Sequence, residues 1–320
     1  MRKIFHRWIG SAAVCLALTG AAAADTAVVK DATGREVTVK DASRIVAIGG
    51  AVTEILYALG LQDRIAAVDT TSSFPARALQ EKPNVGYMRA LSPEGVLGLA
   101  PTLILSIEGA GPKQAMTVID AAGIPLVVVP DPHSGEGILE KVRMIALATG
   151  TEARGRCLAD KVRADLDALK QVRSSIKKPV RVMFVLSFVG GRAMVAGGKT
   201  AADGIIRMAG AVNAIDGYEG YKAINDEAVV AAKPDAVLVM SRSSAEQLTA
   251  ETIFVHPAFT TTPAAASKSY VMMDGLYLLG FGPRTAFAAR DLAFKLYPDL
   301  KPAAFPSERD AKNDTKACAK

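Results

Sequence analysis

The 320-residue chain is poor in the residues that build reactive or metal-binding sites. It has three histidines and three cysteines, and one of each, His6 and Cys15, lies close to the N-terminus. Only two histidines remain, which argues against a catalytic triad and against a dedicated zinc site. With only Cys157 and Cys318 left, disulfides do not build this fold. The sequence leaves open whether these two cysteines pair.

Enzyme motifs are also missing. The chain has no Gly-x-Ser-x-Gly elbow and no His-Glu-x-x-His zinc signature. Gly197-Gly198-Lys199-Thr200 looks like the end of a phosphate-binding loop, but Ala193 stands where that motif needs its first glycine. Because no nucleophile and base can be named, we predict that the protein is not an enzyme.

The first residues have the pattern of a cleavable signal peptide. A basic start (Arg2, Lys3 and Arg7) precedes a short apolar core at 9–18 and small residues at 21–24. The apolar core is too short for a permanent membrane anchor. Cleavage after residue 24 leaves 296 residues (320 minus 24). We therefore expect the mature protein in the periplasm.

A basic face for nucleic acid is lacking as well. Removing the signal segment lowers the count of Lys and Arg from 38 to 35 against 32 Asp and Glu, so the formal charge falls from +6 to +3. No run of Lys or Arg with interleaved aromatic residues is present. This composition argues against a nucleic-acid partner.

Short apolar runs alternate with helical patterns along the mature chain. Strands are expected at 44–48, 103–105 and 126–129, and again at 180–186 and 236–240. Continuous apolar runs are typical of strands covered on both faces, and hence of parallel sheets. The predicted fold class is α/β, with two similar parallel-sheet lobes and a ligand cleft between them.

An internal repeat supports the two lobes. Ser92-Pro93-Glu94-Gly95 with Pro101 matches Asn225-Asp226-Glu227-Ala228 with Pro234 at a constant offset of 133 (227 minus 94, and 234 minus 101). Each copy has a helix N-cap, an acid in the first turn and a proline before the next strand. A tyrosine, Tyr87 or Tyr221, precedes each copy.

The predicted organisation has five segments: a signal peptide at 1–24, an N-terminal lobe at 25–150, a linking helix at 151–177, a C-terminal lobe at 178–301 and a flexible tail at 302–320. Apolar residues at helical spacing indicate the linking helix. One long helix restricts hinge motion, so we expect a rigid clamp. The tail is rich in Lys, Asp, Ala and Pro, which favours disorder.

Tyr87 stands in the loop Val85-Gly86-Tyr87-Met88-Arg89-Ala90-Leu91, just ahead of a helix start. A phenol there can become a phenolate ligand for ferric iron. A packed loop tyrosine is the alternative that the residues alone leave open. Free tyrosine has a pKa of about 10, so the phenolate needs stabilisation, which ferric iron and the Arg89 guanidinium can supply.

The mature chain resembles the substrate-binding proteins of ABC importers for iron-siderophores, cobalamin and haem. Three segments are similar to the haem-binding branch: 86–95, 194–197 (Met-Val-Ala-Gly) and 279–286 (Leu-Gly-Phe-Gly-Pro-Arg-Thr-Ala). The resemblance implies that the protein captures ferric haem and delivers it to an inner-membrane ABC permease. A ferric-siderophore or cobalamin carrier of the same fold is the alternative.

The resemblance also implies roles for single residues. Tyr87 is the axial iron ligand; Arg89, Arg242 and Lys199 are candidates for the haem propionates, and Met88 and Phe281 for the porphyrin faces. Some relatives add a histidine from the C-terminal lobe, but residues 187–192 contain none, so a lone tyrosine ligand is expected. Glu94 and Glu227 are implied to dock a monomer onto the permease, beside their role as first-turn acids.

Overall fold

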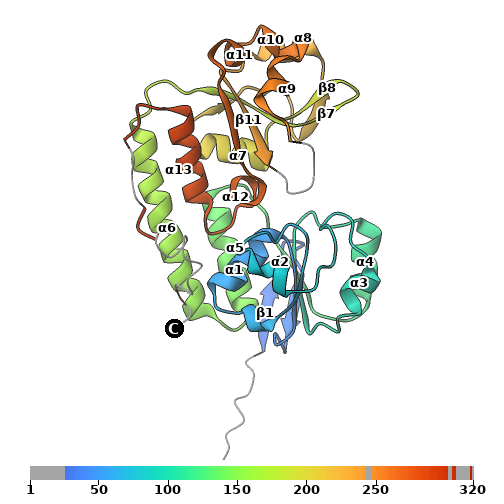
Figure 1. Cartoon of the computed structure of the whole chain (residues 1–320). Helices are drawn as coiled ribbons and strands as arrows, with labels where there is room; N and C mark the ends of the chain where they lie inside the picture. The colour runs from blue at the N-terminus through green and yellow to red at the C-terminus, as the bar shows by residue number, and fades with distance from the viewer. Residues whose placement is uncertain (1–25, 242–246, 302–304, 308–317, 319–320) are drawn as a thin grey trace, which may run out of the picture.

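The computed structural model describes residues 26–241, 247–301, 305–307 and 318. These residues form two α/β lobes, an N-lobe below and a C-lobe above in Figure 1, with the long helix α6 (Glu152–Ser174) running beside both. The predicted α/β class with two lobes is confirmed. Helix α6 lies within the range predicted for the linking helix.

The N-lobe is built on a parallel sheet. Within the described residues its strand order is β4-β3-β5-β6, formed by Ile65–Val68, Ile45–Ile48, Leu103–Ile107 and Leu126–Val129. Strands β3 and β5 are buried along their whole length, as the continuous apolar runs predicted. The surrounding elements are the hairpin β1 (Ala27–Lys30) and β2 (Glu36–Val39), α1 (Gly50–Ala58), a 3-10 turn (Gln62–Arg64), α2 (Arg77–Glu81), α3 (Pro93–Leu97), α4 (Lys113–Ala121) and α5 (Gly135–Ala148).

The C-lobe has a mixed sheet of order β10-β8-β7-β11-β12, with β9 beside β7. The strands are β7 (Arg181–Val189), β8 (Arg192–Ala196), β9 (Val212–Asn213), β10 (Tyr221–Ile224), β11 (Ala236–Ser241) and β12 (Tyr270–Asp274). Strands β7, β11 and β12 pair in parallel, whereas β8 pairs antiparallel with both of its neighbours, β7 and β10. The parallel pairing predicted for the C-lobe holds for β7, β11 and β12. The edge at β8 departs from it, because Gly190 and Gly191, with φ of 56° and 75°, turn the chain directly back into β8.

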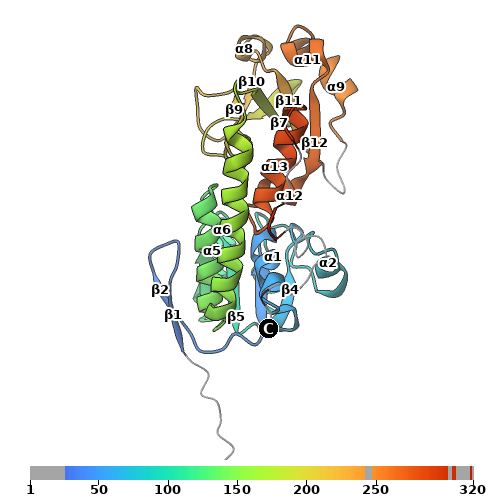
Figure 2. The ribbon, with the colours of Figure 1, turned by 90° about the vertical axis from the view of Figure 1, so that its left-hand side faces the viewer.

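Helices close the C-lobe and return the chain to α6. They are α7 (Ala201–Met208), α8 (Asp226–Ala232), α9 (Ala250–Phe254), α10 (Pro257–Thr260), α11 (Pro263–Ser267), α12 (Gly275–Leu279) and α13 (Thr285–Leu296). Helix α13 lies against α6, and α5 packs on the N-lobe end of α6 (Figures 1 and 2). The two lobes therefore share a spine of long helices. In the described part of the chain, no helix combines the length and the apolar character needed to cross a membrane.

The repeat found in the sequence corresponds to two capped helices. Ser92 caps α3 by accepting a hydrogen bond from the Gly95 amide at 3.4 Å, and Asn225 caps α8 by accepting one from the Ala228 amide at 3.0 Å. Each helix leads into a central parallel strand, β5 or β11. The caps predicted for the two copies are confirmed.

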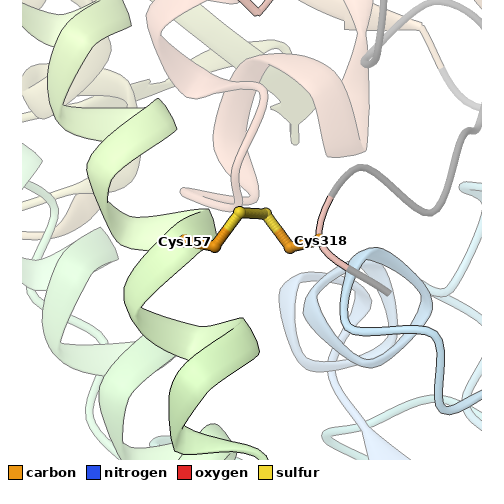
Figure 3. The surroundings of a disulfide bond; sticks show 2 residues. All are labelled: Cys157 and Cys318. Carbon is orange, nitrogen blue, oxygen red and sulfur yellow. A yellow bond between two sulfur atoms is a disulfide. The ribbon is translucent and has the colours of Figure 1, made fainter. Parts of the chain in front are cut away.

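The described residues of the C-terminal tail are attached to the body, so the expectation of a flexible tail does not hold for them. Cys318 forms a disulfide with Cys157 of α6, with an S–S distance of 2.07 Å (Figure 3). The Ser307 amide donates a hydrogen bond to Asp165 of α6 at 3.1 Å. The Phe305 ring lies 5.7 Å from that of Phe287 on α13. A disulfide, a hydrogen bond and an apolar contact thus attach Cys318, Ser307 and Phe305 to α6 and α13.

Candidate functional site

Tyr87 lies in a loop that backbone hydrogen bonds hold on both sides. Gly86, with φ of 92°, accepts a hydrogen bond from the Thr70 amide at 2.9 Å. The Gly111 amide donates to the Met88 carbonyl at 2.8 Å, and the Leu91 amide donates to the Gly111 carbonyl at 2.9 Å. The loop is therefore a fixed platform, although it contains no helix or strand.

The phenol of Tyr87 faces outward from this platform. Its side chain is 44% exposed, which is unusual for a large aromatic residue. An N–H of the Arg89 guanidinium donates a hydrogen bond to its oxygen at 2.9 Å. A permanent cation thus contacts an accessible phenol oxygen, as an anionic oxygen ligand requires.

The second lobe presents a tyrosine of its own. Tyr221 is the first residue of β10 and is 38% exposed. Its ring meets the Phe184 ring edge-on at 6.3 Å, and β10 pairs with β8 through Tyr221 and Ala196. Burial of the oxygen end raises the pKa of Tyr221, while the Ala202 amide, the Thr200 hydroxyl and the charge of Arg89 oppose the rise.

Arg89 connects the two tyrosines electrostatically. Its side chain is bonded to Tyr87 in the N-lobe, and its charge acts on Tyr221 in the C-lobe. The sequence singled out all three residues, but no local pattern indicates that the charge of Arg89 acts on the pKa of Tyr221.

The sequence predicted two further cations, Lys199 and Arg242. The Lys199 ammonium pairs with Glu219 at 2.7 Å, and both side chains are largely exposed. Lys199 stands in the turn before α7 with φ of 56°, so the lysine is near the Tyr221 side of the lobe but already has a carboxylate partner. Arg242 lies outside the described residues.

The two predicted porphyrin walls lie in the core. Phe281 has no exposed surface, and its ring packs 5.1 Å from that of His133, across the contact between the lobes. Met88 is 8% exposed and belongs to the apolar core. Phe281 is unavailable to a ligand in this structure because its contacts are already made by protein, and Met88 offers little surface.

The segment at 279–286 instead joins the lobes. Arg284 at the start of α13 pairs with Glu54 of α1 at 3.0 Å, and the two side chains are 16% and 6% exposed. The Arg284 amide also donates to Glu54 at 3.1 Å, and its guanidinium lies 3.5 Å from the centre of the Phe74 ring. Gly282 contacts the same carboxylate, where an added Cβ would lie 3.2 Å from it.

A second buried charge pair lies next to this junction. Lys141 of α5 has no exposed side-chain surface and donates to Asp131, whose other oxygen lies 3.5 Å from His133. Burial lowers the pKa of Lys141, and the charges of Asp131 and Glu54 oppose that shift. Sequence reasoning missed Glu54 and Lys141. The available signal was a charged residue inside each apolar helix face, Glu54 between Val52 and Ile55, and Lys141 between Leu139 and Val142.

The two predicted docking acids are both on the surface. Glu94 lies in the first turn of α3 and Glu227 in the first turn of α8, and both are exposed. His256, interpreted as a helix-end residue, caps α10 by accepting a hydrogen bond from the Ala258 amide at 3.2 Å. Within the described residues, no three His, Cys, Asp or Glu side chains are grouped as a metal site.

Comparison with known proteins agrees with this architecture. Residues 45–275 match the family described as periplasmic binding protein. The solved structure of the periplasmic heme-binding protein BhuT in complex with two hemes is 37% identical, covers 79% of this chain and 97% of its own, and has a TM-score of 0.75. The periplasmic heme-binding protein RhuT from Roseiflexus sp. RS-1 in apo form is 36% identical, covers 81% of this chain and 99% of its own, and has a TM-score of 0.76.

Curated relatives are more distant. YvrC, an uncharacterized ABC transporter substrate-binding lipoprotein of Bacillus subtilis (strain 168), is 26% identical over 85% of each chain. The vitamin B12-binding protein of Yersinia pestis (strain Pestoides F) is 25% identical over 63% of this chain and 71% of its own. The resemblance predicted from the sequence is confirmed, and these relatives are binding proteins without an enzymatic reaction. The chain belongs to the periplasmic binding protein family and is a substrate-binding protein of an ABC importer, not an enzyme.

Proposed function

We propose that this protein captures ferric haem through an axial Tyr87 phenolate and delivers it to an ABC permease. The observation that carries the proposal is the accessible Tyr87 oxygen with the Arg89 guanidinium at 2.9 Å. An oxidised, hard iron centre prefers an anionic oxygen ligand. The guanidinium stabilises that anion because it is a permanent cation that donates hydrogen bonds.

The structural relatives support haem as the ligand. BhuT and RhuT, both named as heme-binding proteins, are 37% and 36% identical to this chain over nearly their full lengths. Lys199 and Arg242 complete the proposal as cations for the propionates, in addition to Arg89. For Lys199 this requires that a propionate displace Glu219 from the ammonium group.

A cobalamin or ferric-siderophore carrier remains the second candidate, because a vitamin B12-binding protein is among the relatives. The chemistry separates the two. A siderophore already saturates its ferric iron and needs no protein phenolate, whereas a haem iron has free axial positions. A tyrosine bonded to an arginine at the protein surface therefore favours haem.

Hemin titration of the purified protein tests the proposal. We expect the wild type to bind hemin with a phenolate-to-iron charge-transfer band, and Tyr87→Phe to weaken or shift that band while the ring and the fold are kept. Tyr218→Phe is the matched control, since its oxygen lies 3.4 Å from the Val195 carbonyl in the C-lobe. Wild-type protein that binds cobalamin or a ferric siderophore and ignores hemin would show that the proposal is wrong.

Delivery requires a surface for the permease. We place this role on Glu94 and Glu227, which the internal repeat puts on equivalent helices of the two lobes. One exposed acid per lobe suits a partner with two-fold symmetry.

A further inference from the structure

We propose that Asn84 and Asp69 are positioning residues for the Tyr87 phenol, a role that rests on the haem-binding function proposed above. Both act on Gly86, the residue before the tyrosine. Asn84 fixes the Gly86 amide, and Asp69 fixes the segment that holds the Gly86 carbonyl. Gly86 in turn sets the direction in which Tyr87 leaves the N-lobe sheet.

The segment that leads to the phenol continues the N-lobe sheet. It runs parallel to the end of β4, where the Val68 amide donates to the Pro83 carbonyl and the Val85 amide donates to the Val68 carbonyl, both at 2.9 Å. The Thr70 amide extends this pairing by donating to the Gly86 carbonyl at 2.9 Å. Gly86 is therefore attached to the sheet through its carbonyl group.

Gly86 turns the chain in a conformation that favours glycine. Its φ of 92° lies in the left-handed region. A Cβ added to Gly86 would meet no heavy atom within 4 Å, so the backbone conformation, and not a lack of space, requires glycine here. Because a peptide group is planar, a fixed Gly86 carbonyl also fixes the Cα atom of Tyr87.

Asn84 holds the other hydrogen-bonding group of this glycine. The side-chain oxygen of Asn84 accepts a hydrogen bond from the Gly86 amide at 2.8 Å, which forms an Asx turn. Asn84 is exposed and lies outside the apolar core. Its carboxamide thus restrains the turn before Tyr87 without being needed for core packing.

Asp69 fixes the segment whose Thr70 amide holds the Gly86 carbonyl. Asp69 is fully buried, and its carboxylate accepts hydrogen bonds from the Gly49 amide at 2.9 Å and the Thr71 amide at 3.0 Å. The Thr71 hydroxyl also donates to this carboxylate at 2.8 Å. The residues on both sides of Thr70 are therefore tied to the start of α1. Residues that orient a metal ligand in this way tune how tightly the metal is held.

Hemin-loaded full-length variants test the role of Asn84. Asn84→Ala removes the acceptor at an exposed position. We expect the iron–phenolate band in its resonance Raman spectrum to shift or broaden, and hemin to pass to excess apomyoglobin about tenfold faster. Asn84→Asp keeps an acceptor oxygen and should restore both wild-type values. The matched control is Asp41→Ala, because Asp41 accepts from the Ser43 amide at 2.7 Å with the same spacing, in an exposed turn before β3. It should leave both values unchanged.

Amide hydrogen exchange in the protein without hemin gives a measurement that needs no ligand. In Asn84→Ala, the Gly86 amide should exchange about tenfold faster than in the wild type, because it has lost its acceptor. The Gly111 amide, which donates to the Met88 carbonyl at 2.8 Å on the other side of the loop, should keep its wild-type rate.

Thr71→Val tests the contribution of Asp69. It removes the hydroxyl that donates to the Asp69 carboxylate and leaves the buried carboxylate in place. The Thr70 amide should then exchange faster, and the iron–phenolate band should shift in the same direction as in Asn84→Ala. An unchanged Thr70 exchange rate and an unchanged band would exclude Asp69 from the positioning role.

Two results would overturn the role of Asn84. One is an Asn84→Ala variant with the wild-type spectrum, hemin release and Gly86 exchange rate. The other is a change in Asn84→Ala that Asn84→Asp does not reverse. If Tyr87→Phe keeps the wild-type spectrum, Tyr87 is not the ligand, and the proposed function fails together with the positioning role. That result is distinguishable because it appears in the Tyr87 variant itself. Thermal unfolding of each variant identifies any loss of fold.

Discussion

The ion pair between Asp131 and the buried Lys141 is expected to make the stability of this protein depend on pH. Asp131 receives hydrogen bonds from Lys141, which is wholly buried, and lies beside His133. Burial alone would raise the pKa of Asp131, but His133 and Lys141 bring it below its usual value of 3.8. A carboxylate with a lowered pKa stabilises the fold above its unfolded-state value and loses that effect as the pH falls through the lowered value.

Asp131→Asn should therefore lower the free energy of unfolding at neutral pH by about 2 to 3 kcal/mol, because it leaves the buried Lys141 ammonium without its closest anion. Urea unfolding of wild type and variant at about pH 7 and about pH 3 measures the effect. The difference between them should shrink at the lower pH, where wild-type Asp131 is increasingly protonated.

The control is Asp160→Asn, which removes an exposed carboxylate 3.1 Å from Arg163 on the surface of α6. Exposed pairs contribute little, so a change within about 0.5 kcal/mol is expected. A pH-independent deficit in Asp131→Asn would contradict the role given to its ionisation.

At the scale of elements, the crossing of α5 and α6 depends on one glycine. A Cβ added at Gly155 would lie 2.3 Å from the Cβ of Ala146. That is shorter than any ordinary carbon contact, so the two helices approach each other only because Gly155 has no side chain. The crossing positions α6. Helix α6 in turn supports α13, which begins directly after Arg284.

Gly155→Ala should destabilise the protein by about 1 to 2 kcal/mol. The helices must move apart, which outweighs the gain of up to about 1 kcal/mol in helix propensity. Adding Ala146→Gly should recover most of the loss, since one methyl group again occupies the crossing. Urea unfolding of the two single variants and the double variant measures this coupling.

Gly95→Ala in α3 is the control for that series. Its added Cβ would meet only the Ser92 Cβ at 3.8 Å, so a neutral or slightly stabilising effect is expected. If Gly155→Ala behaved in the same way, close packing at the crossing would not be what requires the glycine.

The whole molecule is a pair of lobes held by more than one connection. Helix α6 runs beside both lobes, Glu54 and Arg284 join them through a buried ion pair, and Cys157–Cys318 attaches the C-terminal tail to α6. These connections favour a nearly fixed separation of the two tyrosines. They also fix the separation of Glu94 and Glu227, which a symmetric permease would recognise.

Reversing these two charges should reduce transport without changing haem binding. Glu94→Lys with Glu227→Lys is expected to lower haem uptake by at least about tenfold, or 1.4 kcal/mol of docking free energy. Uptake by cells that express the importer, compared with hemin titration of the same variants, measures both quantities. Glu152→Lys, an exposed first-turn acid of α6, controls for helix-dipole effects. Equal losses from all three positions would contradict docking by Glu94 and Glu227.

Local residue patterns were sufficient for the main strands and helices of this fold and for selecting the residues of the candidate site. The apolar runs predicted β3, β5, β6 and β11, the caps Ser92 and Asn225 predicted two helix starts, and Tyr87 was recognised in its loop. Such features depend on residues within one or two turns of each other. The antiparallel edge at β8 was not foreseen, although Gly190 and Gly191 were there to indicate a turn.

Contacts between distant residues were decided only by tertiary structure. Phe281, expected at the ligand, is fully buried against His133, and the motif around it places Arg284 on Glu54, 230 residues away in the chain. Arg89 bonds to Tyr87 in the N-lobe, and its charge opposes the rise in the pKa of Tyr221 in the C-lobe only because the lobes pack as they do. Periodicity and capping encode local geometry, whereas the packing of two lobes selects among many possible long-range pairings, which no local pattern specifies.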